Sequence, residues 1–152
     1  MSDIDARISA LGHTLPDAPA PAANYVPFVV TGKHLFVSGQ ISNGPDGLIC
    51  GKLGADLTTE EGAKAAETCA LALLAQAKAA TGDLSKVARL VKLVGFVNST
   101  PEFTDQPKVI NGASDLMVAV LGDAGRHARS AVSAASLPLG VAVEIEAIFE
   151  LA

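Results

Sequence analysis

The stretch HARSAVSAASLPLGVAVEIEAIFE, residues 127–150, places charged residues inside a segment that otherwise has the composition of two β-strands. Arg129 stands near the start of the first strand, and Glu144 and Glu146 stand within the second. A guanidinium group binds carboxylates through parallel hydrogen bonds, and a carboxylate can take up and release protons. These residue types therefore offer the binding of a small acid combined with proton transfer.

The second of these strands alternates between an apolar face and a face that carries the acids. Its apolar set is Val141, Val143, Ile145, Ala147 and Phe149. If helices cover the apolar face, the acids point away from the helices, toward a face that could simply be solvated. However, residues 25–30, 34–39 and 130–136 are mostly small or apolar on both sides. We therefore expect the second face to meet another subunit, where an unpaired carboxylate is costly and suggests a function.

A simple hairpin would not bring Arg129 and Glu144 together. If residues 129–136 and 141–149 paired around the sequence LPLG, Glu144 would lie opposite Ser133, four residues from Arg129. At ~3.3 Å per residue this separation is roughly 13 Å along the strands, which is too far for both side chains to hold one small molecule. We predict that the strands do not form a simple hairpin, or that a neighbouring chain completes the pocket.

The elements that must position these residues mix strands and helices. A short helical arm at residues 2–11 and a Pro/Ala connector come first. The predicted elements that follow are a meander of strands at 25–31, 34–41 and 48–54, a helix at 58–82, a strand at 85–99, a helix at 105–122 and the two final strands. Thr58 and Glu61 have the spacing of a capping box, and Gly82 ends that helix. This order predicts an α+β fold with two helices packed on one face of a mixed sheet.

The composition of the chain argues against several kinds of partner and site. The 152 residues carry a formal net charge of -5, and the basic residues form no stripe, so nucleic acid is not expected as a partner. The N-terminus lacks the features of a signal peptide and no apolar run is long enough to cross a bilayer, which predicts a cytoplasmic protein that uses no membrane. Cys50 and Cys69 lack metal-ligand spacing and are expected to be reduced. His13, His34 and His127 are unclustered, so we expect no metal site.

The chain carries two motifs, FVSGQI at residues 36–41 and ARSAVSAASLPLGVAVEIEAIFE near the C-terminus. Both resemble motifs of the RidA family, formerly the YjgF family, of reactive-intermediate imine/enamine deaminases. The resemblance extends over residues 25–150 and divides the chain into an arm with its connector, residues 1–24, and one RidA-like domain, residues 25–152. It implies a chorismate-mutase-like α+β fold and a homotrimer with pockets at the three subunit interfaces.

The resemblance also assigns roles to individual residues. Arg129 corresponds to the family's arginine, which holds the carboxylate of a 2-imino acid by two parallel hydrogen bonds. Glu144 corresponds to the family's acid, which positions or activates a water against the imine carbon. Without the resemblance, Arg129 could instead be a surface charge paired with Asp123.

Four further residues are predicted to line the substrate pocket by the same resemblance: Tyr25, Gly39, Asn111 and Ala131. Tyr25 could instead only pack a subunit interface, and Gly39 could only serve a turn. The family commonly has cysteine where this chain has Ala131, which changes the lining of the pocket more than the water-addition chemistry. This departure, the arm and a different sequence before the second helix indicate a diverged branch.

The sequence thus predicts an enzyme without a cofactor that deaminates small 2-imino or enamine acids by hydrolysis to 2-keto acids and ammonia. Its partners are then a small carboxylate metabolite and two further copies of the chain. Three alternatives remain open: a non-catalytic binder of keto or amino acids, a chorismate-mutase-like isomerase suggested by the fold alone, and an endoribonuclease. The acidic charge and the scarcity of aromatic residues count against the last.

Overall fold

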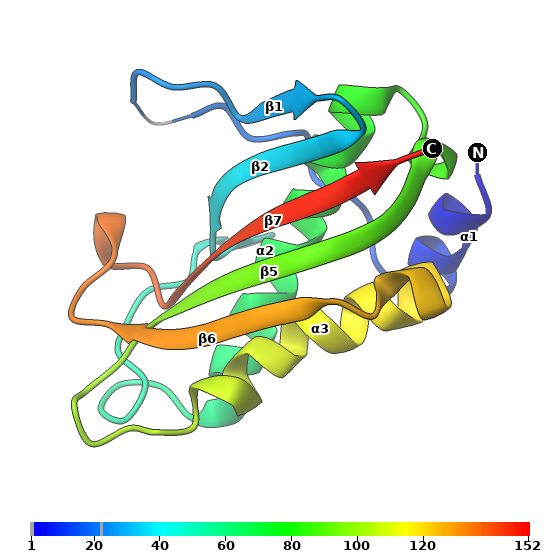
Figure 1. Ribbon diagram of the computed structural model, residues 1–152. Helices are drawn as coiled ribbons and strands as arrows, with labels where there is room; N and C mark the ends of the chain where they lie inside the picture. The colour runs from blue at the N-terminus through cyan, green and yellow to red at the C-terminus, as the bar shows by residue number, and fades with distance from the viewer. Residues whose placement is uncertain (1, 22) are drawn as a thin grey trace.

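A mixed β-sheet and two helices form the two layers of the computed structural model, which describes residues 2–21 and 23–152 (Figure 1). The strands of the sheet are β1 (Phe28–Thr31), β2 (His34–Ile41), β5 (Val87–Asn98), β6 (Ala128–Ala134) and β7 (Val143–Leu151). They lie in the order β1-β2-β7-β5-β6, and only the β5–β6 pair is parallel. The predicted α+β class with a mixed sheet is confirmed. Met1 and Ala22, which belong to the predicted segment 1–24, lie outside the described residues.

Helices α2 (Thr59–Thr81) and α3 (Gln106–Leu121) both pack on one face of the sheet, as predicted (Figure 1). The capping box of Thr58 and Glu61 opens α2, and Gly82, in the left-handed conformation with φ 77°, closes it. The two helices approach closely where Gly112 of α3 meets Ala63 of α2. A Cβ atom on Gly112 would overlap the Ala63 carbonyl oxygen, so this crossing requires glycine.

The predicted helix of the arm is present as α1 (Asp3–Ala10), and it packs against α3. Ile8 is buried there, and Nη1 of Arg7 donates a hydrogen bond to the Val120 carbonyl oxygen at 3.2 Å. Lys78 of α2 pairs with Asp5 at 2.8 Å. Hydrogen bonds from Lys78 and from Ser2 lower the pKa of Asp5 to about 2. The described part of the arm is therefore held by burial and by charge.

The two faces of the sheet differ as the alternation in β7 predicts. Val143, Ile145, Ala147 and Phe149 are buried beneath the helices. The acids between them lie on the opposite face, called here the open face, which α2 and α3 leave uncovered (Figure 1). No helix in the described part of the chain combines the length and the apolar character that crossing a bilayer requires.

The predicted third strand of the meander, residues 48–54, is wrong. Only Leu48 of this segment lies in a strand, since it ends a small hairpin of β3 (Asn43–Gly44) and β4 (Gly47–Leu48). After it, Cys50 and Leu53 make only isolated β-bridges. Gly47, Gly51 and Gly54 have φ values of 108°, 121° and 91°. Each of these left-handed glycines turns the chain, so the segment cannot continue as an extended strand.

The final two strands do not form a hairpin, in agreement with the first of the two predicted possibilities. β5 lies between β6 and β7, pairing with β6 in parallel and with β7 in antiparallel. Similarly, residues 25–27 of the predicted first strand are irregular, since β1 begins only at Phe28. The positions of Arg129 and Glu144 therefore depend on their separate pairings with β5.

Candidate functional site

Glu144 lies beside Gly39 on the open face of the sheet. Gly39 stands in an irregularity of β2, where the pairing with β7 shifts between Val37 and Gln40. A Cβ atom on Gly39 would overlap Oε2 of Glu144. Glycine at this position therefore leaves the space that the carboxylate group occupies, and the two predicted residues meet in one place.

The environment of Glu144 makes the ionised form of its carboxyl less favourable than that of an exposed glutamate. Partial burial raises the pKa of the Glu144 carboxyl above its usual range, and the negative charge of the nearby Glu146 raises it further. A carboxylate whose pKa is raised accepts a proton more readily than an exposed glutamate does. Glu144 therefore has the electrostatic character that an acid–base group requires.

Cys69 of α2 lies behind this strand and does not add a nucleophile. Its Sγ atom is 3.6 Å from the Val143 carbonyl oxygen, and the residue is completely buried. Burial raises the pKa of the Cys69 thiol, and the charge of Glu144 adds to the effect. The thiol form is therefore strongly favoured, in line with a structural role.

Tyr25 lies in the bend before β1 and has a relative exposure of 48%. Ser38 fastens this bend to β2, because its Oγ donates to the Val26 carbonyl oxygen at 2.8 Å and its N–H donates to the Pro27 carbonyl oxygen at 2.9 Å. Ser38 directly precedes Gly39, so these hydrogen bonds hold the bend that carries Tyr25 against β2, next to the residue that faces Glu144. We call Tyr25, Gly39 and Glu144 the glutamate half-site.

Arg129 reaches from β6 to α3. Its Nη1 donates to Oγ of Ser114 at 3.0 Å, and its Nη2 donates to the Pro107 carbonyl oxygen at 3.1 Å. Asn111, which is exposed, lies on the same face of α3 because it is four residues after Pro107 and three before Ser114. Ala131, two residues along β6, faces the same side as Arg129. We call Asn111, Arg129 and Ala131 the arginine half-site.

The two half-sites lie apart within one chain. Arg129 pairs with Leu93 of β5, whereas Glu144 pairs with Phe96 of the same strand. Two strand spacings and three residues of offset separate their Cα atoms by roughly 14 Å. Arg129 also points toward the helix layer and Glu144 toward the open face. One chain therefore does not bring its own arginine and glutamate to a shared small molecule.

The alternative pairing of Arg129 with Asp123 is wrong. Arg126 takes that partner instead, with its Nε atom 3.5 Å from Oδ1 of Asp123. Arg126 is exposed and belongs to the surface, whereas the guanidinium of Arg129 is directed onto α3 by two hydrogen bonds. The two neighbouring arginines thus differ in both exposure and contacts.

Sequence reasoning missed Ser114 and His127, which adjoin the arginine half-site. Nε2 of His127 is 2.8 Å from Oγ of Ser114, and Nδ1 of His127 is 2.6 Å from the Gly125 carbonyl oxygen. His127 was set aside because no other histidine or cysteine lies near it in the sequence. The alternation of side chains along a strand could have indicated His127, because His127 and Arg129 are two residues apart in an extended segment and so lie on the same side of it.

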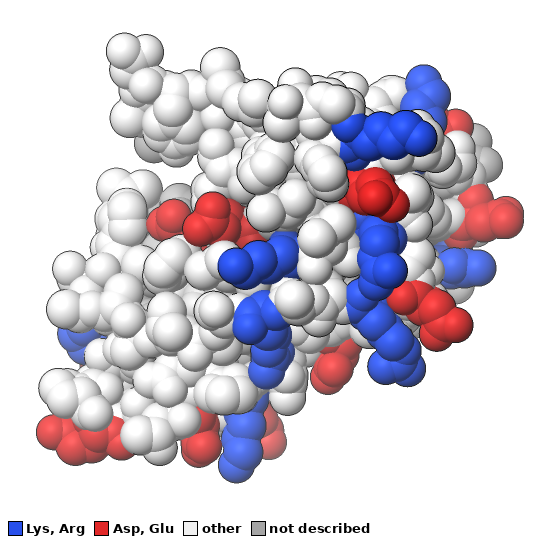
Figure 2. Space-filling model, viewed as in Figure 1, with Lys and Arg blue, Asp and Glu red and all other residues white. Residues whose placement is uncertain are grey.

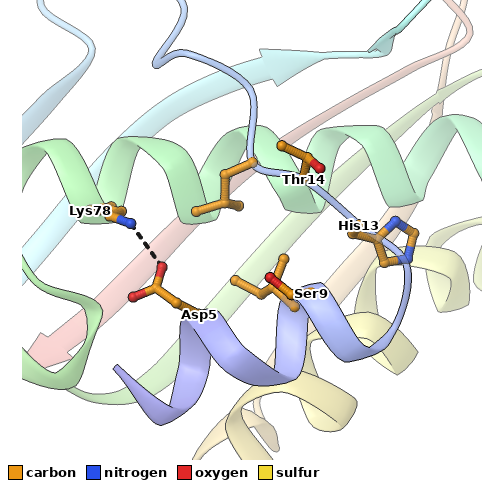
Figure 3. Close-up of a pocket in the computed structure, with 7 residues that line it drawn as sticks. Asp5, Ser9, His13, Thr14 and Lys78 are labelled. Atoms are coloured by element: carbon orange, nitrogen blue, oxygen red, sulfur yellow. Dashed lines mark hydrogen bonds and ion pairs between the residues drawn. The ribbon is translucent and has the colours of Figure 1, made fainter. Parts of the chain in front are cut away.

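A separate hollow lies between α1, the connector and α2 (Figure 3). Its volume is about 460 Å³, and its polar lining includes Asp5, His13 and Lys78. None of the six predicted site residues lines it. Asp5 and Lys78 neutralise each other, and His13 lies 3.6 Å from Glu67, so the charged groups of this hollow already have partners. Among the described residues, His, Cys, Asp and Glu form no group of three that could hold a metal ion.

Comparison with known proteins identifies the family of the chain. Residues 5–151 match the family described as "YjgF/chorismate mutase-like, putative endoribonuclease". The chain belongs to this family. It is the family that the sequence analysis names RidA, so the predicted resemblance and the chorismate-mutase-like fold are confirmed.

Several relatives cover nearly the whole chain. Protein TCP17 of Trypanosoma cruzi is 53% identical over 150 residues, which span 97% of this chain and 94% of that protein. The crystal structure of Atu1372, a protein with unknown function from Agrobacterium tumefaciens, is 51% identical, covers 99% of this chain and 93% of its own, and has a TM-score of 0.92. A "putative endoribonuclease" from Shewanella oneidensis is 35% identical, with coverage of 97% and 99% and a TM-score of 0.94.

More distant members differ more in structure. Escherichia coli TdcF with bound serine is 28% identical, covers 89% of this chain and 94% of its own, and has a TM-score of 0.63. The much higher TM-scores of the Agrobacterium and Shewanella structures group this chain with them, apart from TdcF.

Proposed function

We propose that this RidA-family protein hydrolyses small reactive 2-imino or enamine acids to 2-keto acids and ammonia. The observation that carries the proposal is the division of the site. The arginine half-site offers a carboxylate anchor and the glutamate half-site offers an acid–base group, yet they face in different directions. Each half has the chemistry that the other lacks, so a complete pocket forms where the arginine half-site of one copy meets the glutamate half-site of the next.

The open face supports assembly of this kind. Val29, Phe36 and Val132 have relative exposures of 51%, 44% and 45%, and register places all three on this face with Glu144. Figure 2 looks onto this face from the same side as Figure 1 and shows large uncharged areas, interrupted by some acidic and basic side chains. Exposed apolar surface of this extent favours a partner, and a closed ring of three copies would bury it and create three pockets.

The proposed reaction needs only water. Arg129 holds the substrate carboxylate through the N–H groups that its contacts with α3 leave free, and Asn111 and Ala131 line the same wall. Glu144 accepts a proton as water adds to the carbon of the protonated imine, giving a neutral carbinolamine. The carboxyl then gives this proton to the nitrogen. As the carbon–nitrogen bond breaks and ammonia leaves, the hydroxyl of the carbinolamine passes its proton to the Glu144 carboxylate, and the 2-keto acid forms.

In one alternative, the same pocket binds a small acid without catalysing a reaction. TdcF is described with bound serine, which is a small amino acid with a carboxylate. The same two half-sites could hold such a ligand as a signal, with Glu144 only shaping the pocket. Binding without turnover would then be expected.

The test measures ammonia release from an imino acid that an amino-acid oxidase generates in situ. The wild-type protein is expected to accelerate release above the buffer rate, whereas Arg129→Ala and Glu144→Gln are each expected to lower kcat/KM by about a hundredfold or more. Arg126→Ala and Glu150→Gln are the matched controls, since they remove the same charges outside both half-sites.

The outcomes separate the candidates. If the wild type is no faster than buffer with several imino acids but binds 2-keto acids in an Arg129-dependent manner, the binding alternative replaces catalysis. If Arg126→Ala reduces the rate as much as Arg129→Ala, the assignment of the carboxylate anchor is wrong.

A further inference from the structure

Arg129 is the end of a chain of hydrogen bonds that begins at a backbone carbonyl. The Gly125 carbonyl oxygen can only accept, so Nδ1 of His127, 2.6 Å away, must carry a proton. In the neutral imidazole Nε2 then has a free lone pair and accepts from the Ser114 hydroxyl at 2.8 Å. The Ser114 oxygen, having donated its proton, accepts from Nη1 of Arg129 at 3.0 Å. Every donor in this chain therefore meets one acceptor.

The neutral form of His127 suits this arrangement better than the imidazolium. A protonated ring would donate from both nitrogens, so the Ser114 oxygen would accept from His127 and from Arg129, and the Ser114 hydroxyl proton would lose its acceptor on His127. It would also place a second positive charge close to the guanidinium. The contact of Nδ1 with Gly125 thus selects the tautomer that lets Ser114 receive Arg129.

The chain fixes the plane of a group that is otherwise mobile. An arginine side chain has several rotatable bonds, and ordering it at the moment of binding costs free energy. Here the Ser114 hydroxyl and the Pro107 carbonyl oxygen hold the two Nη atoms against one face of α3. Two of the five guanidinium N–H groups are used in this way, and three remain for a ligand carboxylate.

We infer that Ser114 and His127 are positioning residues, which hold the Arg129 guanidinium ready for the carboxylate of a 2-keto or 2-imino acid. The inference rests on the proposed function only for its ligand class, because the hydrogen-bond chain consists of the protein's own groups. Its expected effect is on affinity. A guanidinium that must first be ordered binds a carboxylate more weakly, while the Glu144 carboxyl is untouched.

Nuclear magnetic resonance of the ¹⁵N-labelled, assembled protein tests the chain without any substrate. His127 is expected to be the Nδ1-protonated tautomer, with Nε2 shifted by the hydrogen bond from Ser114, and Ser114→Ala is expected to abolish that shift. A ring protonated on Nε2 alone would overturn the inference, whatever the enzyme activity proves to be.

The functional test uses 2-oxobutanoate as the probe of binding and the ammonia assay as the probe of turnover. Ser114→Ala is expected to weaken 2-oxobutanoate binding and to raise KM by about five- to tenfold, with kcat changed less than twofold. His127→Gln can keep an acceptor toward Ser114 and is expected to stay near the wild type, whereas His127→Asn loses that acceptor and is expected to behave like Ser114→Ala. Asp115→Ala, an exposed change on α3, is the control for helix stability.

The results distinguish the two proposals. If no imino acid is turned over but 2-oxobutanoate binding still follows the predicted order of variants, the positioning role stands and the deaminase function fails. If Ser114→Ala binds 2-oxobutanoate as tightly as the wild type, or if the wild type does not bind it, the positioning role is wrong. Equal losses in the Gln and Asn variants of His127 would contradict it as well.

Discussion

The raised pKa of Glu144 predicts that ionising this residue costs the folded protein stability. Its pKa lies above the ordinary value of 4.5 because of partial burial and the charge of Glu146. The folded state therefore binds more protons than the unfolded state as the pH rises above about 4.5, so stability falls over that range. Glu144→Gln removes this cost. We expect it to raise the thermal midpoint at about pH 8 and to have almost no effect at about pH 4.

Thermal unfolding of Glu144→Gln and the wild type across this pH range measures the effect. Glu150→Gln, on the same strand, is the control for the loss of one negative charge. A difference in midpoint that stays the same at both ends of the range would contradict the assigned cause. The expected gain also fits a functional residue, since acid–base groups are commonly kept in environments that are unfavourable for stability.

Individual site residues were partly accessible from the sequence. Arg129, Glu144 and Gly39 stand in motifs, and the structure gives each of them a specific environment. Ser114 and His127 were missed because they meet only when β6 lies beside α3, which no local pattern reveals. Their roles as site residues, like those of Tyr25, Asn111 and Ala131, remain predictions.

At the scale of elements, the close crossing of α2 and α3 makes a sharp prediction about Gly112. A methyl group there would overlap the Ala63 carbonyl oxygen, which is backbone and cannot turn aside. We expect Gly112→Ala to lower the free energy of unfolding by about 3 kcal/mol, because the helices must separate. Urea unfolding measures the change.

Gly44→Ala is the matched control for this prediction. A Cβ atom on Gly44 would meet its nearest neighbour, Cδ1 of Ile49, at an ordinary 3.6 Å. Its effect is expected to stay within about 1 kcal/mol. If both variants lose stability equally, the loss reflects the general effect of replacing glycine and not the helix crossing.

Elements with local end signals were predicted well, whereas the order of the strands in the sheet was not predicted. The capping box at Thr58 and the glycine at position 82 predict a helix over residues 58–82, and the structure has α2 at Thr59–Thr81. By contrast, β6 and β7 follow each other in the chain but are separated by β5, a choice that depends on contacts distant in sequence. Residues 48–54 have a strand-like composition, yet their glycines turn the chain.

At the scale of the whole molecule, the divided site predicts complementation between subunits. Arg129→Ala damages only the arginine half-site and Glu144→Gln damages only the glutamate half-site. In a ring of three copies, each pocket would combine one half-site from each of two neighbours. Any ring that contains both variants then has one pocket with both groups intact, whichever variant is present twice.

Co-expression of the two variants with different affinity tags, followed by purification on both tags, isolates such mixed assemblies. We expect them to release ammonia at about one third of the wild-type rate per trimer, although each variant alone keeps only about one hundredth of the activity or less. The control is an assembly in which the copies under both tags carry Arg129→Ala. Its rate should stay as low as that of Arg129→Ala alone. If mixed assemblies of the two different variants are also inactive while the wild type turns over, then both groups of a pocket come from the same chain. That outcome would overturn the divided site, whereas the roughly 14 Å between the Cα atoms of Arg129 and Glu144 in one chain favours complementation.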